Sequence, residues 1–281
     1  SLTLEVDKFG NVLKSATIGY GRREKILVVD KQSVITEIPN PDLNQLDSDD
    51  RMKQTQLLIT YTENEVTKPI DDSVVYPNDY RTPLPCESRT HEVTGFELTG
   101  DAIRFSFNEF ADNNFQSLLA LHEIEYEQST DDYTKKQKRL IECVRTLYRK
   151  DNLSGLLGKR ELDPMALPGE SYKLAFTPGL LDQVYVRSGQ KLLPANPADV
   201  LEYGSIDHGG YVNLDGDGYW WIPSGRAFYS PNINETPLQE LDYANQHFFL
   251  PHRFRDPFSN ETIITYDSNT NEPDRNYNLL V

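Results

Sequence analysis

Hydrophobic and polar residues alternate with a period of two along several stretches of the chain, a pattern typical of strands. It appears first in Leu2–Val6 and continues over residues 12–23 and 25–38. Gln56–Thr62 and Thr90–Leu98 repeat it. The sequence therefore predicts a mainly β chain whose first 38 residues form long strands in a hairpin, with one strand over each of the three early stretches.

Two short stretches share the form D-x-F-[GS]-N: DKFGN at 7–11 and DPFSN at 256–260. Asp and Asn beside a small residue suit a turn with positive φ, because their side chains can hydrogen-bond to the backbone. We predict a β-hairpin around each. On the residues alone, two unrelated hairpins with a common turn chemistry are the simpler interpretation. The predicted turn residues are Asp7, Gly10, Asn11, Asp256 and Asn260.

Other segments interrupt the strands. Residues 39–53 are polar and acidic and residues 64–84 are rich in proline and aspartate, so both are expected to be loops. Three short helices are predicted later in the chain, because a capping residue followed by proline begins a helix. The three predicted starts are Thr177-Pro178, Asn196-Pro197 and Thr236-Pro237.

The segment 135–150, KKQKRLIECVRTLYRK, fits two patterns. Apolar residues at 140, 144, 147 and 148 have the spacing of one helix face. As a strand, the even-numbered residues from 140 to 148 would share one face. Composition alone favours the helix.

Composition limits the classes of partner. The 281 residues, enough for one large or two medium domains, carry 28 Lys and Arg against 44 Asp and Glu, a formal charge of -16. This balance argues against nucleic acid and against an anionic membrane surface, because both require a basic protein surface. No apolar run reaches the length of a membrane-spanning helix. The chain begins within a strand pattern and ends at Leu279-Leu280-Val281, so we expect a segment of a longer protein.

Only two cysteines are present, Cys86 and Cys143. Two cysteines do not form a disulfide framework, and no CxxC pair indicates a metal site. A bridge between them is an open alternative, but two buried free thiols are the favoured interpretation.

The sharpest candidate for chemistry is NLDGDG, in which Asn213, Asp215 and Asp217 resemble the first half of a calcium loop. The bidentate Glu of such loops is missing, because Ser224 stands at the twelfth position. A glycine-rich turn is therefore favoured over a metal site.

Trp220 and Trp221 follow that loop in the strand-like stretch YWWIP. Neighbouring residues of a strand point to opposite faces, so one tryptophan is expected in the core and the other is free to stack on a sugar. A calcium-assisted glycan-binding module centred on Asp215, Asp217 and the two tryptophans is the alternative function.

Catalytic motifs are absent from the sequence. None of the five histidines lies in HxH or HExxH, and no GxSxG elbow occurs. Asp207 and His208 with nearby acids give a weak hydrolase hypothesis, which no motif supports. We therefore predict a protein without catalytic residues or cofactor.

Longer stretches carry a resemblance to a known family. The sequences LEVDKFGNVLKSATIGYGRR, TLYRKDNLSGLL, LPGESYKLAFTPGLL and WWIPSGRAFYSP resemble the TcdB-like middle-to-C-terminal region of the B component of bacterial insecticidal Tc toxin complexes, over nearly the whole chain. RFRDPFSNETIITYD resembles an Rhs/YD repeat, with Tyr266 and Asp267 as the name-giving pair. Three segments follow: a hairpin segment at 1–126, the middle/C-terminal toxin region at 127–250 and the start of the repeat at 251–281.

The resemblance implies a fold and a role. The fold would be mainly β, with long hairpins of an Rhs-type β-shell, a few short helices and a strand at 135–150. The role would be structural: in a secreted virulence complex, the shell encloses and delivers the toxic C-terminal region of the C component. The partners would be the C component with its enclosed cargo and, through other parts of the parent chain, the A component. The family's self-cleaving protease belongs to the C component, so no catalytic residue is carried over.

Overall fold

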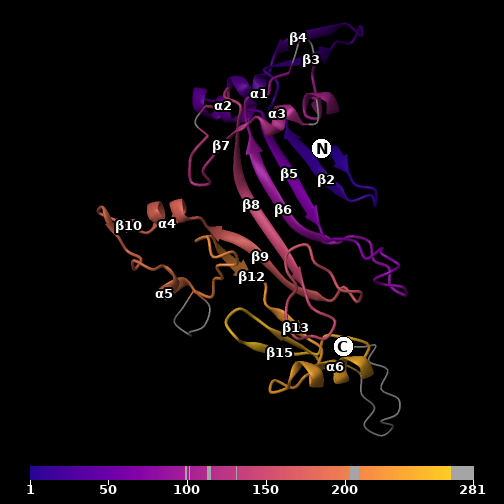
Figure 1. Ribbon diagram of the computed structural model, residues 1–281. Coiled ribbons are helices and arrows are strands. Elements are labelled where there is room, and N and C mark those ends of the chain that lie inside the picture. The colour runs from indigo at the N-terminus through magenta and orange to yellow at the C-terminus, as the bar shows by residue number, and fades with distance from the viewer. Residues whose placement is uncertain (99, 101, 113–114, 131, 203–208, 267–281) are drawn as a thin grey trace. The chain divides into compact units, whose positions relative to one another are not determined.

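The computed structural model describes residues 1–281 except 99, 101, 113–114, 131, 203–208 and 267–281, and its elements are drawn in Figure 1. The chain is mainly β, as predicted. The largest sheet has the order β1-β2-β5-β6-β8-β9-β12, with β7 beside β8. Its strands are β1 (Leu2–Val6), β2 (Val12–Gly19), β5 (Leu58–Val66), β6 (Pro85–Val93), β7 (His122–Ile124), β8 (Gln137–Tyr148), β9 (Pro168–Phe176) and β12 (Trp220–Pro223).

Smaller sheets and short helices complete the described structure. The small sheets are β3 (Lys25–Val29) with β4 (Ile35–Pro39), β10 (Val186–Arg187) with β11 (Gln190–Lys191), and β13 (Arg226–Phe228) with β14 (Arg253–Arg255) and β15 (Glu261–Ile263). The helices are α1 (Pro41–Asn44), α2 (Ser48–Thr55), the 3-10 helix η1 (Phe107–Glu109), α3 (Gln116–Leu119), α4 (Pro178–Val184), α5 (Ala198–Leu201) and α6 (Pro237–Gln246).

The chain forms two compact units. The first unit comprises residues 1–7, 12–63 and 90–141, and the second comprises 8–11, 64–89 and 142–281. Strands β5, β6 and β8 each contribute residues to both units. The division of the sequence at 126 and 250 concerns toxin-family segments and stays a prediction.

The first unit has an apolar core. Antiparallel pairing sets Leu2 opposite Ala16 in the β1–β2 hairpin, so alternate residues point into the core. Two of the aromatic rings, Phe96 and Phe110, stack with centroids 5.0 Å apart. The buried residues of this core are Leu4, Ala16, Ile59, Tyr61, Val93, Phe105, Phe110, Leu118 and Leu121.

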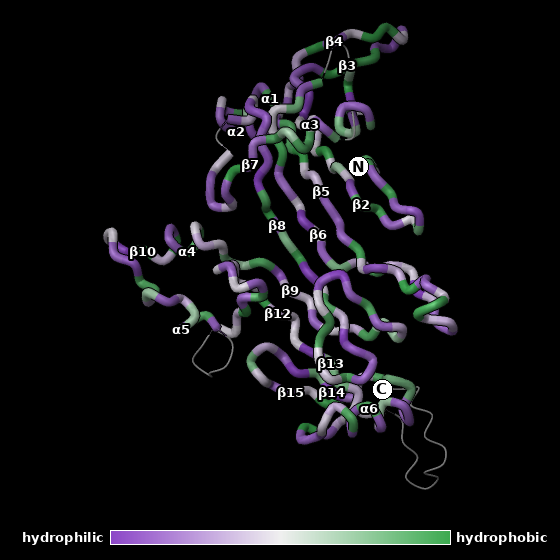
Figure 2. The backbone as a smooth tube through the Cα atoms, viewed as in Figure 1, coloured by the Kyte–Doolittle hydropathy of each residue, from purple (hydrophilic) through white to green (hydrophobic). Residues whose placement is uncertain are grey.

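The stretch 25–38 differs from the single strand predicted for it, because it folds back on itself as the β3–β4 hairpin. The Asp30 carboxylate accepts hydrogen bonds from the amides of Gln32 and Val34, at 2.9 and 2.8 Å, and Ser33 has φ of 64°. The alternation of apolar and polar residues continues through this Asp-centred turn, so the pattern alone did not indicate that the chain folds back here. Most of the hairpin's residues are exposed, and Figure 2 shows hydrophobic segments along it.

The loop predicted at 39–53 is wrong as well, because α1 and α2 occupy most of that segment. Asn40 accepts a hydrogen bond from the Asp42 amide at 3.1 Å, and Asp47 accepts one from the Asp50 amide at 2.8 Å. These side chains cap the two helices, which are polar almost throughout and bury only Leu43. The segment lacks the apolar periodicity that marks a helix, so only its caps signalled one.

The ambiguous segment at 135–150 forms strand β8 over Gln137–Tyr148. The strand implied by the family resemblance is confirmed, and the helix favoured by composition is wrong. In this strand Cys143 and Arg145 are buried, whereas Glu142 is exposed, so odd-numbered residues point inward here. A register irregularity between Leu147 and Tyr148 then returns the even-numbered Tyr148 to the interior.

All three predicted helices are present, with the predicted caps at Thr177 and Thr236, but the N-cap of α5 is Pro197 and not Asn196. Thr177 accepts a hydrogen bond from the Leu180 amide at 3.1 Å at the start of α4. Thr236 and Gln239 form a capping box at the start of α6. Helix α5 begins at Ala198, whose amide donates to the side chain of Asn196 at 3.3 Å.

Candidate functional site

The DPFSN turn joins β14 to β15 in the second unit, and the two strands pair in antiparallel register with Arg255 opposite Glu261. Asp256 Oδ1 accepts hydrogen bonds from the amides of Phe258 and Asn260, both at 2.8 Å. Asn260 Nδ2 donates to Asp256 Oδ2 at 2.8 Å. This bond and the backbone donors hold the pKa of the Asp256 carboxyl below its ordinary value.

The DKFGN turn joins β1 to β2 in the same way. The small residue of each turn has positive φ, 91° at Gly10 and 66° at Ser259. The two stretches therefore adopt related turns, one with a residue that favours this conformation and one without. Tyr266 donates a hydrogen bond to the carbonyl of Pro251 at 2.9 Å, and its predicted companion Asp267 lies outside the described residues.

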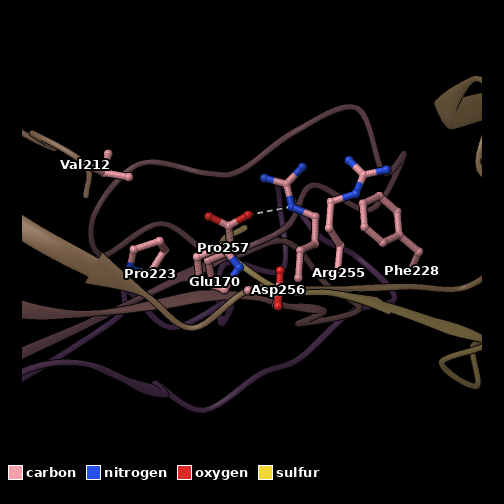
Figure 3. A pocket seen from close by; sticks show the side chains of 9 residues that line it. Glu170, Val212, Pro223, Phe228, Arg255, Asp256 and Pro257 are labelled. Atoms are coloured by element: carbon pink, nitrogen blue, oxygen red, sulfur yellow. Dashed lines mark hydrogen bonds and ion pairs between the residues drawn. The ribbon is translucent and has the colours of Figure 1, made fainter. Parts of the chain in front are cut away.

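A cavity of about 210 Å³ lies beside the DPFSN turn (Figure 3). We call it the arginine pocket, and its lining comes from β9, β12, β13, β14 and the turns beside them. The lining residues are Glu170, Val212, Pro223, Gly225, Arg226, Phe228, Arg255, Asp256 and Pro257.

Two arginines of this pocket are each held at Nε by a carboxylate. Arg226 Nε donates to Glu170 Oε1 at 2.7 Å. Arg255 Nε donates to Glu261 Oε1 at 2.5 Å, and its guanidinium lies 4.8 Å from the centre of the Phe228 ring. Figure 3 shows Arg255 beside that ring. These contacts fix the orientation of both guanidinium groups.

Arg253 is buried next to the pocket and contacts Glu261 and Phe228. It is 1% exposed, and its Nη1 donates to both carboxylate oxygens of Glu261 at 2.9 Å. Its guanidinium lies 3.8 Å from the centre of the Phe228 ring. Burial acts to raise the pKa of Glu261, but the hydrogen bonds from Arg253 and Arg255 outweigh it, so that pKa is lowered.

A second cluster surrounds the buried Glu87, and we call it the Glu87 cluster. Arg145 Nε donates to Glu87 Oε2 at 2.6 Å, and Lys159 Nζ donates to Oε1 at 2.8 Å. Arg89 Nη2 lies 2.6 Å from Oε1. Burial acts to raise the pKa of Glu87, but these cations outweigh it, so the pKa is lowered and the side chain is ionised.

The calcium candidates lie next to this cluster. Arg145 Nη1 donates to both oxygens of Asp215, at 3.0 and 2.8 Å. Asp217 accepts a hydrogen bond from the Tyr219 amide at 3.0 Å, as a turn residue does. The amide oxygen of Asn213 is buried and has no hydrogen-bond partner among the described residues. Among the described residues, no group of three or more His, Cys, Asp or Glu side chains could hold a metal ion.

The two tryptophans differ from the expectation that one would be exposed, because Trp220 and Trp221 are both 4% exposed. A register irregularity between them in the β12–β9 pairing breaks the alternation of faces. Trp220 packs in an apolar cluster with Leu181 and Leu201. The Trp221 ring lies 4.8 Å from the guanidinium of Arg145, so neither indole offers a face to a sugar.

The most deeply buried ion pair among the described residues was not predicted from the sequence. Arg149 and Glu240 have side chains 3% and 5% exposed, and Arg149 Nη2 donates to Glu240 Oε2 at 2.8 Å. Arg149 also donates to the Leu153 carbonyl at 3.0 Å, and the Tyr229 amide donates to Glu240 at 2.8 Å. The partners are 91 residues apart, and nothing in the sequence links them.

Both cysteines are buried and free, as favoured by the sequence. Burial is the main cause that raises the pKa of Cys143 to about 11, and it also raises the pKa of Cys86. Asp207 and His208, the basis of the hydrolase hypothesis, lie outside the described residues.

Part of the chain matches a known protein family. Residues 1–76 match the family model of the insecticide toxin TcdB middle/C-terminal region. The predicted resemblance to a TcdB-like toxin region is confirmed. No curated protein matches the chain. No helix within the described part of this TcdB-like chain is long and apolar enough to cross a membrane.

The fold of the TcdB-like chain is similar to a solved structure, the crystal structure of TcdB2-TccC3 without hypervariable C-terminal region. The TM-score is 0.50 at 16% sequence identity, and the match covers 95% of this chain and 12% of that chain. The likeness shows the fold. This chain therefore corresponds to a small part of the length of its structural neighbour.

Proposed function

We propose that this chain is a non-catalytic structural segment of the B component of an insecticidal toxin complex. It forms part of a hollow β-shell that encloses and delivers the toxic C-terminal region of the C component. The observation that carries this proposal is the fold similarity to TcdB2-TccC3 over 95% of the chain. The matching toxin-family region at residues 1–76 supports it.

The physical character of the chain fits a wall segment. Its strands pair mostly antiparallel, and its two D-x-F-[GS]-N turns close hairpins, as a wall made of successive hairpins requires. The second of these turns would begin an Rhs/YD repeat at 251–281. The β3–β4 hairpin exposes large apolar side chains such as Leu27, Val29 and Ile35, which suits a surface covered within a larger assembly.

The proposal names partners and a location. The C component and its cargo are direct partners, whereas the A component is reached through other parts of the parent chain. A formal charge of -16 disfavours nucleic acid and membrane as partners of this segment. The assembled complex is a secreted, extracellular virulence factor of a bacterium.

The calcium-assisted glycan module is not favoured by any observation. It requires Asp215 to bind a cation and one tryptophan to stack on a sugar. Instead, Asp215 pairs with Arg145, and both tryptophans are buried. A catalytic role has no support either, since no cofactor or catalytic residue follows from the sequence or the family.

Protease protection tests the enclosure of the cargo. The full parent chain would be co-expressed with a C-type partner, and the C-terminal region of the partner would be followed by immunoblot during limited proteolysis. The proposal expects that region to resist cleavage in the complex and to be cleaved rapidly after urea treatment. An affinity tag on a terminus of the parent chain that lies outside the shell serves as the control. Its cleavage shows that the protease is active. Equally fast cleavage of tag and cargo in the intact complex would contradict the proposal.

A further inference from the structure

We propose that the arginine pocket binds the carboxylate of an acidic side chain presented by a peptide segment. This inference goes beyond the role as a wall segment and does not depend on it. It rests on the free donors of two arginines, on the charges around them and on the size of the cavity.

The donors come from Arg226 and Arg255. Each uses its Nε for one carboxylate, Glu170 and Glu261 respectively, and neither Nη group makes a hydrogen bond with a described residue. Their side chains are 32% and 36% exposed, so the free ends are accessible from the cavity. A guanidinium presents parallel donors that match the two oxygens of a carboxylate.

The acidic residues of the lining do not use up these free donors. Glu170 accepts from Arg226 through one oxygen and from the Tyr172 hydroxyl through the other, at 2.5 Å. Asp256 is occupied by the amides and the side chain of its own turn. Both carboxylates therefore have hydrogen-bond partners, whereas the Nη donors of Arg226 and Arg255 have none among the described residues.

The charges of the lining disfavour a dianion more than a monoanion. Two arginines and two carboxylates line the cavity, so its formal charge is close to zero. A dianionic phosphate would meet repulsion from Glu170 and Asp256, whereas a carboxylate adds a single charge beside the free Nη groups. Guanidinium donors are typical of the recognition of acidic side chains, whereas chain-terminal carboxylates are typically held by backbone amides.

The volume of the cavity suits one side chain of a ligand. A volume of about 210 Å³ corresponds to about seven waters of liquid, which suits a carboxylate with a short aliphatic stem. Val212, Pro223 and Pro257 give the wall apolar surface that such a stem can contact. Drug-sized ligands and cofactors need larger cavities.

The pocket is rigid on the side of the free donors. Gly225 has φ of 84°, and a side chain there would meet the carbonyl of Arg255 at 2.5 Å, so the backbones lie close together. The carboxylates of Glu170 and Glu261 hold the guanidinium groups in place before a ligand arrives. Such preorganisation lowers the entropic cost of binding.

The test uses small probes on the whole chain. N-acetyl-glutamate α-amide supplies the acidic side chain, and N-acetyl-glutamine α-amide is its neutral isostere. N-acetyl-alanine supplies a terminal carboxylate, and inorganic phosphate supplies a dianion. We expect the Nε–Hε NMR signals of Arg226 and Arg255 to shift with the glutamate probe, weakly and saturably, and at least tenfold less with each other probe at equal concentration. Equal or stronger shifts with the glutamine probe, N-acetyl-alanine or phosphate would overturn the proposal.

Variants test the assigned donors by calorimetry. Arg226→Gln is expected to weaken binding of the glutamate probe at least tenfold, and Arg255→Lys severalfold because the charge remains but the fork is lost. Arg187→Gln, an exposed arginine away from the lining, is the matched control and should change nothing. Glu170→Gln should tighten binding severalfold, because it removes a negative charge beside Arg226 while the amide oxygen of glutamine can still accept the hydrogen bond that orients the guanidinium. Unchanged or weaker binding by Glu170→Gln would contradict the proposal even if Arg226→Gln failed to fold.

Discussion

The two compact units differ in what fills their interiors. Among its described residues, the first unit has an apolar core of nine buried side chains, in which large rings such as Phe105 and Phe110 pack together. The second unit has several smaller apolar clusters, with buried ion pairs beside them. Arg149–Glu240 and Arg145–Glu87 are the most buried of these pairs. The stability of the first unit therefore depends on how completely apolar side chains fill its core. The stability of the second unit also depends on the pairing of its buried charges.

This difference predicts two kinds of response to substitution. An apolar core loses stability in proportion to the volume removed, because neighbouring side chains relax only in part. A buried ion pair contributes little net stability relative to an apolar pair of the same shape, but the loss of one partner leaves a buried charge uncompensated. We expect graded effects in the first unit and abrupt effects in the second.

The largest effect is expected at the Arg149–Glu240 pair. Glu240→Ala should lower the free energy of unfolding by about 3–5 kcal/mol, because it leaves the Arg149 guanidinium buried without a counter-charge. Urea denaturation followed by circular dichroism measures this. The control is Glu142→Ala, which removes an exposed pair with Lys173 and should cost at most about 1 kcal/mol.

A double replacement sharpens this test. Arg149→Met with Glu240→Leu removes both charges and should recover part of the stability lost by Glu240→Ala. The rest stays lost, because the Tyr229 amide and the Leu153 carbonyl no longer have these side-chain partners. A double variant that is as unstable as the sum of its single variants would show that the pair does not act as a unit, and the contrast between the two units would fail.

The next effect is expected in the first unit at Ile59, which is 3% exposed. Ile59→Ala should cost about 3 kcal/mol and Ile59→Val about 1 kcal/mol, in step with the volume lost. The same urea titration gives both values. Equal losses for the two variants would contradict a graded core.

Acid should weaken the Glu87 cluster. Because the folded-state pKa of Glu87 is lowered, its contribution is fully present above the unfolded-state pKa of about 4.3 and is lost as pH falls through the folded-state pKa. Glu87→Gln should therefore cost about 2 kcal/mol at pH 7. The difference in the free energy of unfolding between this variant and the unsubstituted chain should shrink as pH falls below about 4.3. Urea titrations over a pH series would show this. A difference that stays constant from pH 7 to the acid limit would exclude an ionised Glu87.

The smallest effect compares the two turns. Ser259→Gly should stabilise the chain by about 0.5–1 kcal/mol, because φ of 66° suits glycine better than serine. Gly10→Ser should destabilise it by about 1 kcal/mol, because φ of 91° disfavours a side chain although the space is open. Thermal unfolding of both variants measures this, and shifts in the same direction would mean that the turns are not equivalent.

Part of this structure follows from local chemistry and could be predicted. The turns of DKFGN and DPFSN, the caps at Thr177 and Thr236 and the free cysteines need only neighbouring residues or composition. The mainly β fold follows from period-two alternation together with the family resemblance.

The rest depends on pairing between distant segments. Arg145 points inward only because Glu87 lies 58 residues before it and Asp215 lies 70 after it, which no local pattern records. Trp220 and Trp221 are both buried because of a register irregularity against β9, which alternation cannot anticipate. The arginine pocket likewise combines residues from 170 to 257, so no local pattern in the sequence reveals it.

Electron microscopy of the full parent chain, co-expressed with a C-type partner, would test whether this segment belongs to the wall of a shell. We expect a closed hollow particle with residues 1–281 in its wall and density for the cargo inside. A compact solid particle, or a parent chain that does not associate with the partner, would contradict the role as a wall segment.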